Sequence, residues 1–489
     1  MSAARSLASC ALTSRAAARW QRLSPVRRVW AALGLLLGLL LVFFCTMIAI
    51  ELIAGYAVFQ RAEGQNSITN ATPGEIERGA YLAKVGNCAA CHTARGGAAM
   101  AGGKAIHTPF GAVYTSNITP DPATGIGRWS QQAFYRALHD GRSSDGRLLT
   151  PAFPYTNYRH VTRADADALY AYFMQAVQPV VQANQTHELP FPLNTQLALA
   201  AWRVLFFEQS TAQDAINKEA SYAGFIRAEG QNTAQIERGA YLVRGLGHCS
   251  ACHAQRNALG ATMQDQRLSG ALMPLQDWYA PSLLARDQAG VQHWPRADIV
   301  ALLKTGVAPQ ASVAGPMAEV VAKSTQYWIE ADLQATAAYL QSLPESPGKP
   351  SAKSMAIPPA TPTPPATASG QSSPLFERGA QLYTRHCATC HGEQGQGLQV
   401  EGSVALPALA GNRAVNMAHT ANLVRIILAG GYAPSTAGNP RPFGMPPFVH
   451  VLPDEDIAAV VSYIRAAWGN QAAGVSAAEV VRHRKGVLP

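Results

Sequence analysis

The sequence predicts an all-α protein in which one N-terminal transmembrane helix precedes three similar helical domains. A long apolar run without a charge lies near the N-terminus, and a short cysteine and histidine motif occurs three times. Each copy of the motif lies between two segments with helical patterns. The chain has 489 residues, which leaves room for about three domains.

The apolar run covers residues 29–50 and is expected to anchor the chain in a membrane. At 1.5 Å per residue it forms a helix of about 33 Å, enough to cross the hydrocarbon core. Six arginines and no acidic residue precede it within residues 1–28, which places the N-terminus in the cytoplasm. We therefore expect a cytoplasmic basic head at 1–28 and an anchor at 29–59 in the bacterial inner membrane, with the remainder periplasmic. The alternative is a cleaved signal peptide, whose apolar region is usually shorter and ends in small residues.

The formal net charge of +9 comes mainly from this arginine-rich head. The rest of the chain is close to neutral, and it shows no basic face of the kind that binds nucleic acid. No nucleic-acid partner is expected.

Six of the eight cysteines fall into three C-x-x-C-H motifs, a pattern typical of covalent c-type haem attachment. Two thiols three residues apart lie on one helical turn and can both reach the vinyl groups of one porphyrin edge. The imidazole that follows can then bind the iron. The remaining cysteines, Cys10 and Cys45, lie in the head and the anchor, and no disulfide is expected in the exported part.

Two other readings of these motifs fit less well. A zinc ribbon needs C-x-x-C pairs about 15–20 residues apart, whereas these motifs are separated by more than a hundred residues. A redox dithiol does not require the histidine. We therefore expect three covalently bound haem c groups. The expected thioether residues are Cys88, Cys91, Cys249, Cys252, Cys387 and Cys390, and the expected proximal iron ligands are His92, His253 and His391.

Each motif follows one helix and precedes another. The first helix contains Glu-Arg-Gly-Ala in all three copies, at residues 76–82, 236–242 and 376–382. Closing helices are expected where apolar residues recur at helical spacing, at Asp165–Val177, Glu330–Leu343 and Asp454–Trp468. Two such helices crossing, with the motif just after the first, are the plan of a class I cytochrome c domain.

These repeats set the expected domain limits. We expect cytochrome c domains at 60–185, 186–344 and 375–470, with a C-terminal tail at 471–489. A duplicated stretch at Phe59–Asn66 and Phe225–Asn232 precedes the first two motifs. Residues 345–374 are rich in Pro, Ser, Thr and Ala and are expected to form an extended linker.

A methionine opposite the histidine would complete each electron-transfer haem and raise its potential. In the third domain we expect Met445, because it lies in a proline-stiffened loop just before the closing helix. In the second domain we expect Met317, which holds the corresponding position. The competing residues are Met417 in the third domain, and Met263 and Met273 in the second.

The first domain lacks a methionine in this loop and carries Phe153 there. Phenylalanine cannot bind iron, so the first haem has no clear distal ligand and an open or weakly ligated iron is an alternative. The candidates left open are Met100, His107, His139, His160 and Met174.

Four stretches of residues 59–470 resemble the three-haem cytochrome c subunits of bacterial membrane-bound dehydrogenases. They are RGAYLAKVGNCAACHT, PFGAVYTSNITPDPATGIGRWS, GPMAEVVAKSTQYW and the loop FGMPPF. The resemblance implies the three histidine ligands and distal ligation by Met317 and Met445. It also implies electron delivery from a separate catalytic subunit to the respiratory chain, usually to ubiquinone.

Catalytic partners in this family are quinoprotein alcohol dehydrogenases, flavoprotein sugar or gluconate dehydrogenases, or molybdenum hydroxylases. Alcohol-dehydrogenase-like members carry methionine at the position of Phe153, and phenylalanine there resembles the molybdenum-hydroxylase branch. We therefore expect a molybdopterin-type catalytic subunit, accompanied by a small iron–sulfur subunit.

The expected function is electron transfer within a periplasmic dehydrogenase complex, without catalytic residues in this chain. No nucleophile–base arrangement is evident in the sequence. Two alternatives remain: a haem enzyme that uses an open first haem, and a cytochrome subunit of a terminal oxidase.

Overall fold

The structure is a computed structural model that describes most of the chain. It covers residues 24–62, 71–207, 233–263, 268–273, 275–309, 311–346, 374–398 and 406–484. Most of the basic head, most of the linker and the second copy of the duplicated stretch lie outside these ranges. The described residues form one long helix and three units, which we call the first (71–207), second (233–346) and third (374–484) unit.

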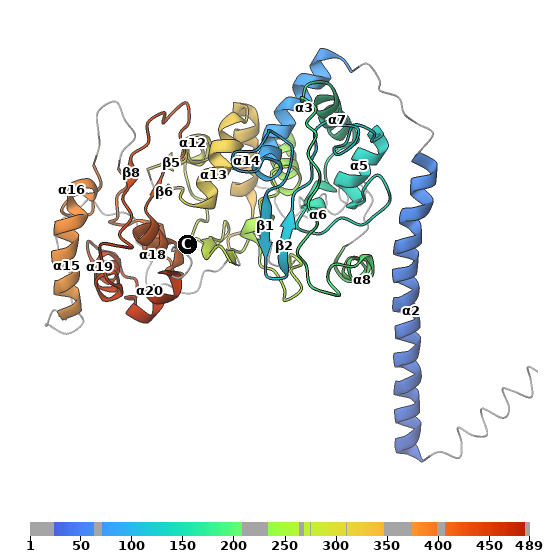
Figure 1. Ribbon diagram of the computed structural model, residues 1–489. Helices are drawn as coiled ribbons and strands as arrows, with labels where there is room; N and C mark the ends of the chain where they lie inside the picture. Colours follow the sequence, from blue (N-terminus) through green and yellow to red (C-terminus); the bar gives the residue numbers. More distant parts are fainter. Residues whose placement is uncertain are drawn as a thin grey trace, which may run out of the picture.

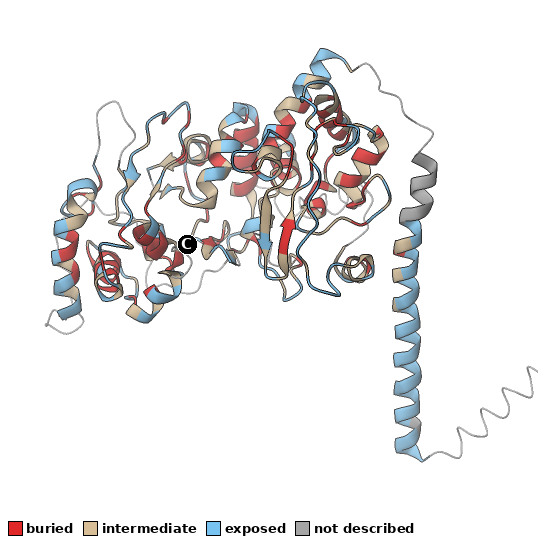
Figure 2. Ribbon diagram, in the orientation of Figure 1, coloured by how far each residue is buried: buried red, intermediate tan, exposed pale blue. Residues whose placement is uncertain are grey.

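The long helix, α2 (Pro25–Ala62), stands away from the three units over most of its length (Figures 1 and 2). It begins four residues before the predicted anchor, because Pro25 suits the first turn of a helix. Within the described residues it is the only helix long and apolar enough to cross a membrane, over Pro25–Ala54. Its apolar side chains are exposed, as expected of a helix that packs against lipid.

Each unit is built on two helices that cross at a glycine. The glycine of the repeated Glu-Arg-Gly-Ala sequence is Gly79, Gly239 or Gly379. A Cβ atom at these positions would lie 1.9, 2.0 and 2.3 Å from a backbone oxygen of the partner helix. Only glycine allows this approach, so the repeat fixes the crossing. The helix pairs are α3 (Pro73–Val85) with α7 (Arg163–Gln175), α10 (Thr233–Arg244) with α14 (Glu330–Ser342), and α15 (Pro374–His386) with α19 (Asp454–Ala466).

The closing helices lie close to their predicted positions. α14 and α19 begin at the predicted acidic residues, whereas α7 begins two residues before Asp165. The reason is Thr162, whose side chain accepts a hydrogen bond from the backbone N–H of Asp165 and thereby caps the helix. α3 starts with a full capping box between Thr72 and Glu75.

The remaining elements are short and surround the crossed helices. The first unit adds α4 (Cys88–His92), β1 (Ala105–Thr108), β2 (Gly111–Tyr114), α5 (Gln131–Asp140), α6 (Tyr155–Tyr158) and α8 (Gln196–Phe206). The second adds α11 (Ser250–His253), β3 (Ala271–Met273), β4 (Trp278–Ala280), α12 (Arg296–Thr305), β5 (Val307–Ala308), β6 (Ala311–Ser312), α13 (Pro316–Lys323) and η2 (Thr325–Tyr327). The third adds α16 (Ala388–His391), α17 (Arg413–Asn416), α18 (Ala421–Ala429), β7 (Gly431–Tyr432), β8 (Gly444–Met445) and α20 (Ala477–Arg484).

The prediction of an all-α fold describes the main helices correctly but omits several short strands. The described residues contain four two-stranded antiparallel pairs, β1–β2, β3–β4, β5–β6 and β7–β8. Strands of two to four residues are too short to show the alternating pattern by which strands are recognised in a sequence.

Three predicted boundaries differ from the structure. Residues 186–207 belong with the first unit, because the Glu188 N–H donates to the Ala112 carbonyl and α8 packs on α2. The second unit extends to Ser346, whose N–H donates to the Leu284 carbonyl. The predicted tail includes α20, which packs on α18 and α19 with Val480 fully buried.

One apolar core runs through the first two units. Leu82, Leu242 and Leu333 all belong to it and are almost completely buried. The third unit has a separate core, which contains Leu382 and Ile457. The first two units therefore form one body and the third packs as its own.

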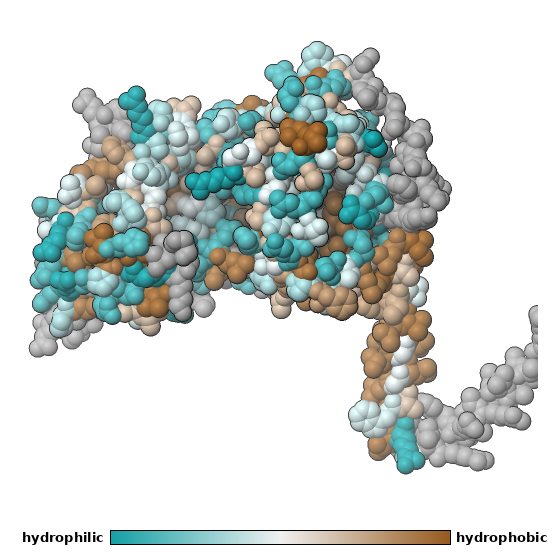
Figure 3. All heavy atoms as spheres, viewed as in Figure 1, coloured by the Kyte–Doolittle hydropathy of each residue, from teal (hydrophilic) through white to brown (hydrophobic). Residues whose placement is uncertain are grey.

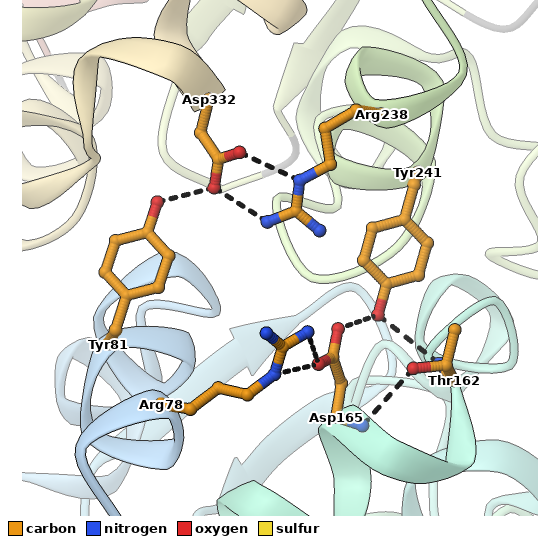
Figure 4. A network of polar contacts seen from close by, with 7 residues as sticks. All are labelled: Arg78, Tyr81, Thr162, Asp165, Arg238, Tyr241 and Asp332. Carbon is orange, nitrogen blue, oxygen red and sulfur yellow. Dashed lines mark hydrogen bonds and ion pairs between the residues drawn. The ribbon is translucent and has the colours of Figure 1, made fainter. Parts of the chain in front are cut away.

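A buried carboxylate joins the first unit to the second (Figure 4). Asp165 on α7 receives hydrogen bonds from the Arg78 guanidinium of its own unit, at 2.7 and 2.5 Å. It also accepts a hydrogen bond of 2.5 Å from the Tyr241 hydroxyl of the second unit. Asp165 is 1% exposed, so these donors are needed to compensate its burial.

The second unit makes the reciprocal contact. Asp332 on α14 accepts two hydrogen bonds of 2.8 Å from Arg238 and one of 2.6 Å from Tyr81 of the first unit. Each tyrosine therefore reaches across to the other unit's aspartate (Figure 4). In the third unit the ion pair of Arg378 with Asp456 is kept, but Gln381 stands at the tyrosine position.

We expect Gly79→Ala to lower the free energy of unfolding by about 1–3 kcal/mol, because the added methyl group forces α3 away from α7. The matched control is Gly74→Ala in the first turn of the same helix, where a Cβ atom meets nothing within 4 Å. Chemical denaturation and hydrogen exchange of α3 and α7 measure the effect. Equal stability of the two variants would contradict the close crossing.

Candidate haem-binding sites

Each C-x-x-C-H motif lies immediately after the first helix of its unit. A sharp turn separates α3 from Cys88, and Asn87 in this turn has a φ of 53° in the left-handed region. His248 holds the corresponding place before Cys249, with a φ of 37°. In the third unit Cys387 follows α15 directly, and its N–H donates to the Tyr383 carbonyl. The helix end thus fixes the position of each motif.

The three motif histidines share one hydrogen-bonding pattern. Nδ1 of His92 lies 2.7 Å from the Ser116 carbonyl oxygen. Nδ1 of His253 lies 2.7 Å from the Pro281 carbonyl oxygen. Nδ1 of His391 lies 2.9 Å from the Pro407 carbonyl oxygen. A carbonyl can only accept, so Nδ1 carries the proton and Nε2 keeps its lone pair, as in metal-binding histidines.

Burial shifts the pKa values of the motif histidines in the direction that favours iron binding. It lowers the pKa of His92, His253 and His391, and the neutral ring is the form that binds a metal. Burial also raises the pKa of the first thiol of each motif, to about 12 for Cys88 and Cys249 and about 11 for Cys387. These half-buried thiols are therefore protonated rather than poised as thiolates.

A cavity of about 420 Å³ lies where the second and third units meet. Its walls are mainly apolar and carry both thiols and the histidine of the second motif, together with Cys387 and His391 of the third. Paired thiols, an imidazole with a free nitrogen and apolar walls fit a covalently attached haem. Within the described residues no group of three or more Cys, His, Asp or Glu lies in an arrangement that could hold a bare metal ion.

The expected distal methionines line the same cavity. Met317 is the second residue of α13 and Met445 lies in β8 opposite Gly431. Two of the competing residues, Met273 and Met417, also line it, whereas Met263 does not. The structure therefore places both predicted ligands on the wall of one cavity, each together with one competing methionine of its own unit.

None of the five candidate distal ligands of the first site lines this cavity. Met100 is buried in the core and His107 is exposed on β1. The His139 ring stacks on Tyr135 and has its Nδ1 3.0 Å from Asp140 Oδ1. Phe153 packs against Tyr158, with ring centroids 5.4 Å apart. The first unit thus carries an aromatic side chain at the loop position where the other units carry Met317 and Met445.

The first and second motifs are close to each other across the unit interface. Burial raises the pKa of the Cys252 thiol, and Arg256 and Cys91 are near enough to act on it. Val85 and Asn87 of the first unit line the large cavity as well. The second unit therefore contacts the motif regions of both neighbours.

Polar contacts hold the third unit against the second. Asn422 on α18 accepts a hydrogen bond of 2.8 Å from the Tyr279 N–H and donates one of 2.7 Å to the Tyr279 carbonyl. The His419 ring stacks on the Tyr279 ring at 4.0 Å. Arg413 donates to the Gly290 carbonyl and lies over the Trp294 ring. These contacts keep the two sites that share the cavity at a fixed separation.

Sequence reasoning missed the residues that join the units. Tyr81 and Tyr241 hold the same position in the first two copies of the repeat, and Gln381 holds it in the third. This difference could have indicated that only the first two units are joined through tyrosines. Trp294 could not be recognised from the sequence as a residue of the cavity wall. Its Nε1 is buried and has no hydrogen-bond partner in the described structure. The residue that contacts its ring, Arg413, comes from a segment distant in sequence, which no local pattern reveals.

Comparison with known proteins identifies the family. The cytochrome c family model matches residues 76–176 and 376–468. The cytochrome c subunit of the quinone-type alcohol dehydrogenase of Gluconacetobacter polyoxogenes is 38% identical over 443 residues, which is 89% of this chain and 88% of that protein. The chain belongs to the cytochrome c subunits of dehydrogenases.

Other relatives of this cytochrome c subunit serve different dehydrogenases. The gluconate 2-dehydrogenase cytochrome c subunit of Pantoea cypripedii is 36% identical over 84% of this chain and 89% of that protein. One of the nicotinate dehydrogenase subunits of Pseudomonas putida is 38% identical over 80% of this chain but only 30% of its own length. The predicted resemblance is confirmed, and the cytochrome c subunit is an electron-transfer subunit rather than a catalytic enzyme.

Proposed function

We propose that this cytochrome c subunit carries three haem c groups and passes single electrons from a catalytic dehydrogenase subunit to ubiquinone. The supporting observation is the pattern repeated in all three units, in which a half-buried histidine directly after a C-x-x-C pair donates Nδ1–H to a backbone carbonyl. The second unit lies outside the matched family ranges, and its glycine crossing and histidine contact support including it.

The residues proposed to hold the three groups are those of the motifs. Cys88 with Cys91, Cys249 with Cys252, and Cys387 with Cys390 form the thioether links. His92, His253 and His391 supply the proximal nitrogens, and Met317 and Met445 are the proposed distal ligands. When bound, haem supplies reversible one-electron chemistry at iron.

The chain itself contributes orientation, apolar surroundings and proximity. The backbone carbonyls of Ser116, Pro281 and Pro407 fix the plane and tautomer of each proximal ring. The cavity that the second and third motifs share presents mainly apolar walls to both sites. Residues 71–207, 233–346 and 374–484 are the proposed cytochrome c domains, held at the periplasmic face of the inner membrane by α2.

The catalytic partner is proposed to be of the molybdopterin type, accompanied by a small iron–sulfur subunit. Phe153 supports this choice over a quinoprotein or flavoprotein partner. A relative named for nicotinate dehydrogenase and one named for quinone-type alcohol dehydrogenase are both 38% identical to this chain, so the choice depends on Phe153. Nicotinate is an N-heteroaromatic acid of the kind that molybdenum hydroxylases oxidise.

We expect the complex purified through this subunit to contain molybdenum and non-haem iron, measured by elemental analysis against haem iron. Mass spectrometry of the largest copurified chain provides the control, because it identifies the catalytic subunit independently of its cofactor. A complex that holds quinone cofactor or flavin in place of molybdenum would contradict the partner proposal and leave electron transfer intact.

We expect three haem c groups per chain in the denatured protein, measured by mass and by pyridine haemochrome absorbance. Cys249→Ser with Cys252→Ser should reduce the number to two, because the second site loses both thioether links. The matched control is Cys45→Ser in the anchor, which should keep all three. Two haems in the unmodified chain, and the same two after Cys249→Ser with Cys252→Ser, would remove the second unit from the proposal.

Met445→Leu should lower the reduction potential of one haem and abolish its sulfur-to-iron absorption band, because methionine ligation raises the potential. Spectroelectrochemical titration of the full chain measures both effects. Met417→Leu is the matched control, since this methionine lines the same cavity and is not the proposed ligand. The reverse result would assign the iron to Met417.

A further inference from the structure

A buried ion cluster joins the membrane helix to the first unit. Glu51 on α2 is only 6% exposed. Its Oε1 lies 2.7 Å from Arg142 Nη2 and 2.6 Å from Arg203 Nε. Arg142 Nη2 also donates to the Glu51 carbonyl at 2.8 Å. A carboxylate between two buried arginines fixes the position of α2 against the unit.

This cluster also sets the level of the membrane surface on the protein. Glu51 is the first charged residue after the apolar run of residues 29–50, which spans about 33 Å, the thickness of the hydrocarbon core. The bilayer that holds this run therefore ends next to Glu51. Any element fixed to Glu51 lies at the boundary between lipid and water.

α8 is such an element. Arg203 belongs to α8, and the helix packs directly on α2. In Figure 1, α8 is viewed nearly end-on while α2 runs along the picture, so the axis of α8 crosses that of α2. A helix in this position runs along the membrane surface rather than through it.

The outer side of α8 is apolar. Leu197 and Leu205 are 60% and 54% exposed, and they lie on one stripe because they are eight residues apart. Arg203, the one charged residue of α8, points inward to Glu51 and is almost fully buried. Phe191 and Leu193, which precede α8, and Leu259, whose carbonyl accepts from Trp202, extend the exposed apolar surface. Figure 3 shows hydrophobic surface along α2 and on the neighbouring edge of the first unit.

We propose that α8 is an interfacial helix whose face of Phe191, Leu193, Leu197, Leu205 and Leu259 inserts into the same bilayer that α2 spans. An amphipathic helix in this plane buries its apolar side in the headgroup and acyl boundary. The lipid surface is the occupant that the structure favours, because the face is continuous with α2 and lies at the level of Glu51. The inference depends on α2 spanning the membrane and not on electron transfer.

The test uses the full haem-loaded chain in vesicles of phosphatidylcholine and phosphatidylglycerol that contain a phosphatidylcholine with a photoreactive diazirine in its acyl chain. After illumination, peptide mass mapping locates the lipid adducts. Adducts are expected on the peptides of α2 and α8. The peptide of Tyr432, which is exposed on the third unit, is the control and should carry none.

A charge variant tests the face directly. Leu197→Glu with Leu205→Glu should reduce the α8 adducts several-fold and leave those of α2 unchanged, with circular dichroism and haem content as controls for folding. Adducts on α2 without adducts on α8 would overturn the proposal alone, and a lack of adducts on α2 would overturn the anchor with it.

Discussion

The close crossing of two helices at a glycine is the constraint on which the rest of each unit depends. The first helix cannot shift along its partner while Gly79, Gly239 or Gly379 lies against a backbone oxygen. Its end therefore has one position, and the cysteine pair and histidine begin there. The loop that follows then supplies a backbone carbonyl to the histidine Nδ1 in each unit.

The three units are alike in plan but are joined in two ways. The first two share one apolar core and exchange tyrosines across their interface. The third keeps its own core and meets the second through polar contacts around Tyr279 and through the walls of a shared cavity. The second unit thus stands between its neighbours, an arrangement well suited to passing electrons along the chain.

Structural features that depend on short sequence patterns could be predicted from the sequence. The crossed helices and the long apolar helix were predicted correctly, because each depends on residues close in sequence. The haem-binding roles of the motif cysteines and histidines stay predictions. The role of Glu51 was missed, because its partners Arg142 and Arg203 lie 91 and 152 residues away. The distal ligand of the first site stays unassigned, because the loop with Phe153 offers no side chain that binds iron.

The exchanged tyrosines have a consequence for how the chain matures. Asp165 receives its last hydrogen bond from a residue 76 positions further along, and Tyr81 finds its acceptor 251 positions away. Because the chain is synthesised from its N-terminus, the first unit cannot form these two hydrogen bonds until the second unit has been synthesised. The hydrogen-bonding partners of Asp165 and Tyr81 are therefore complete only once the second unit is present beside the first.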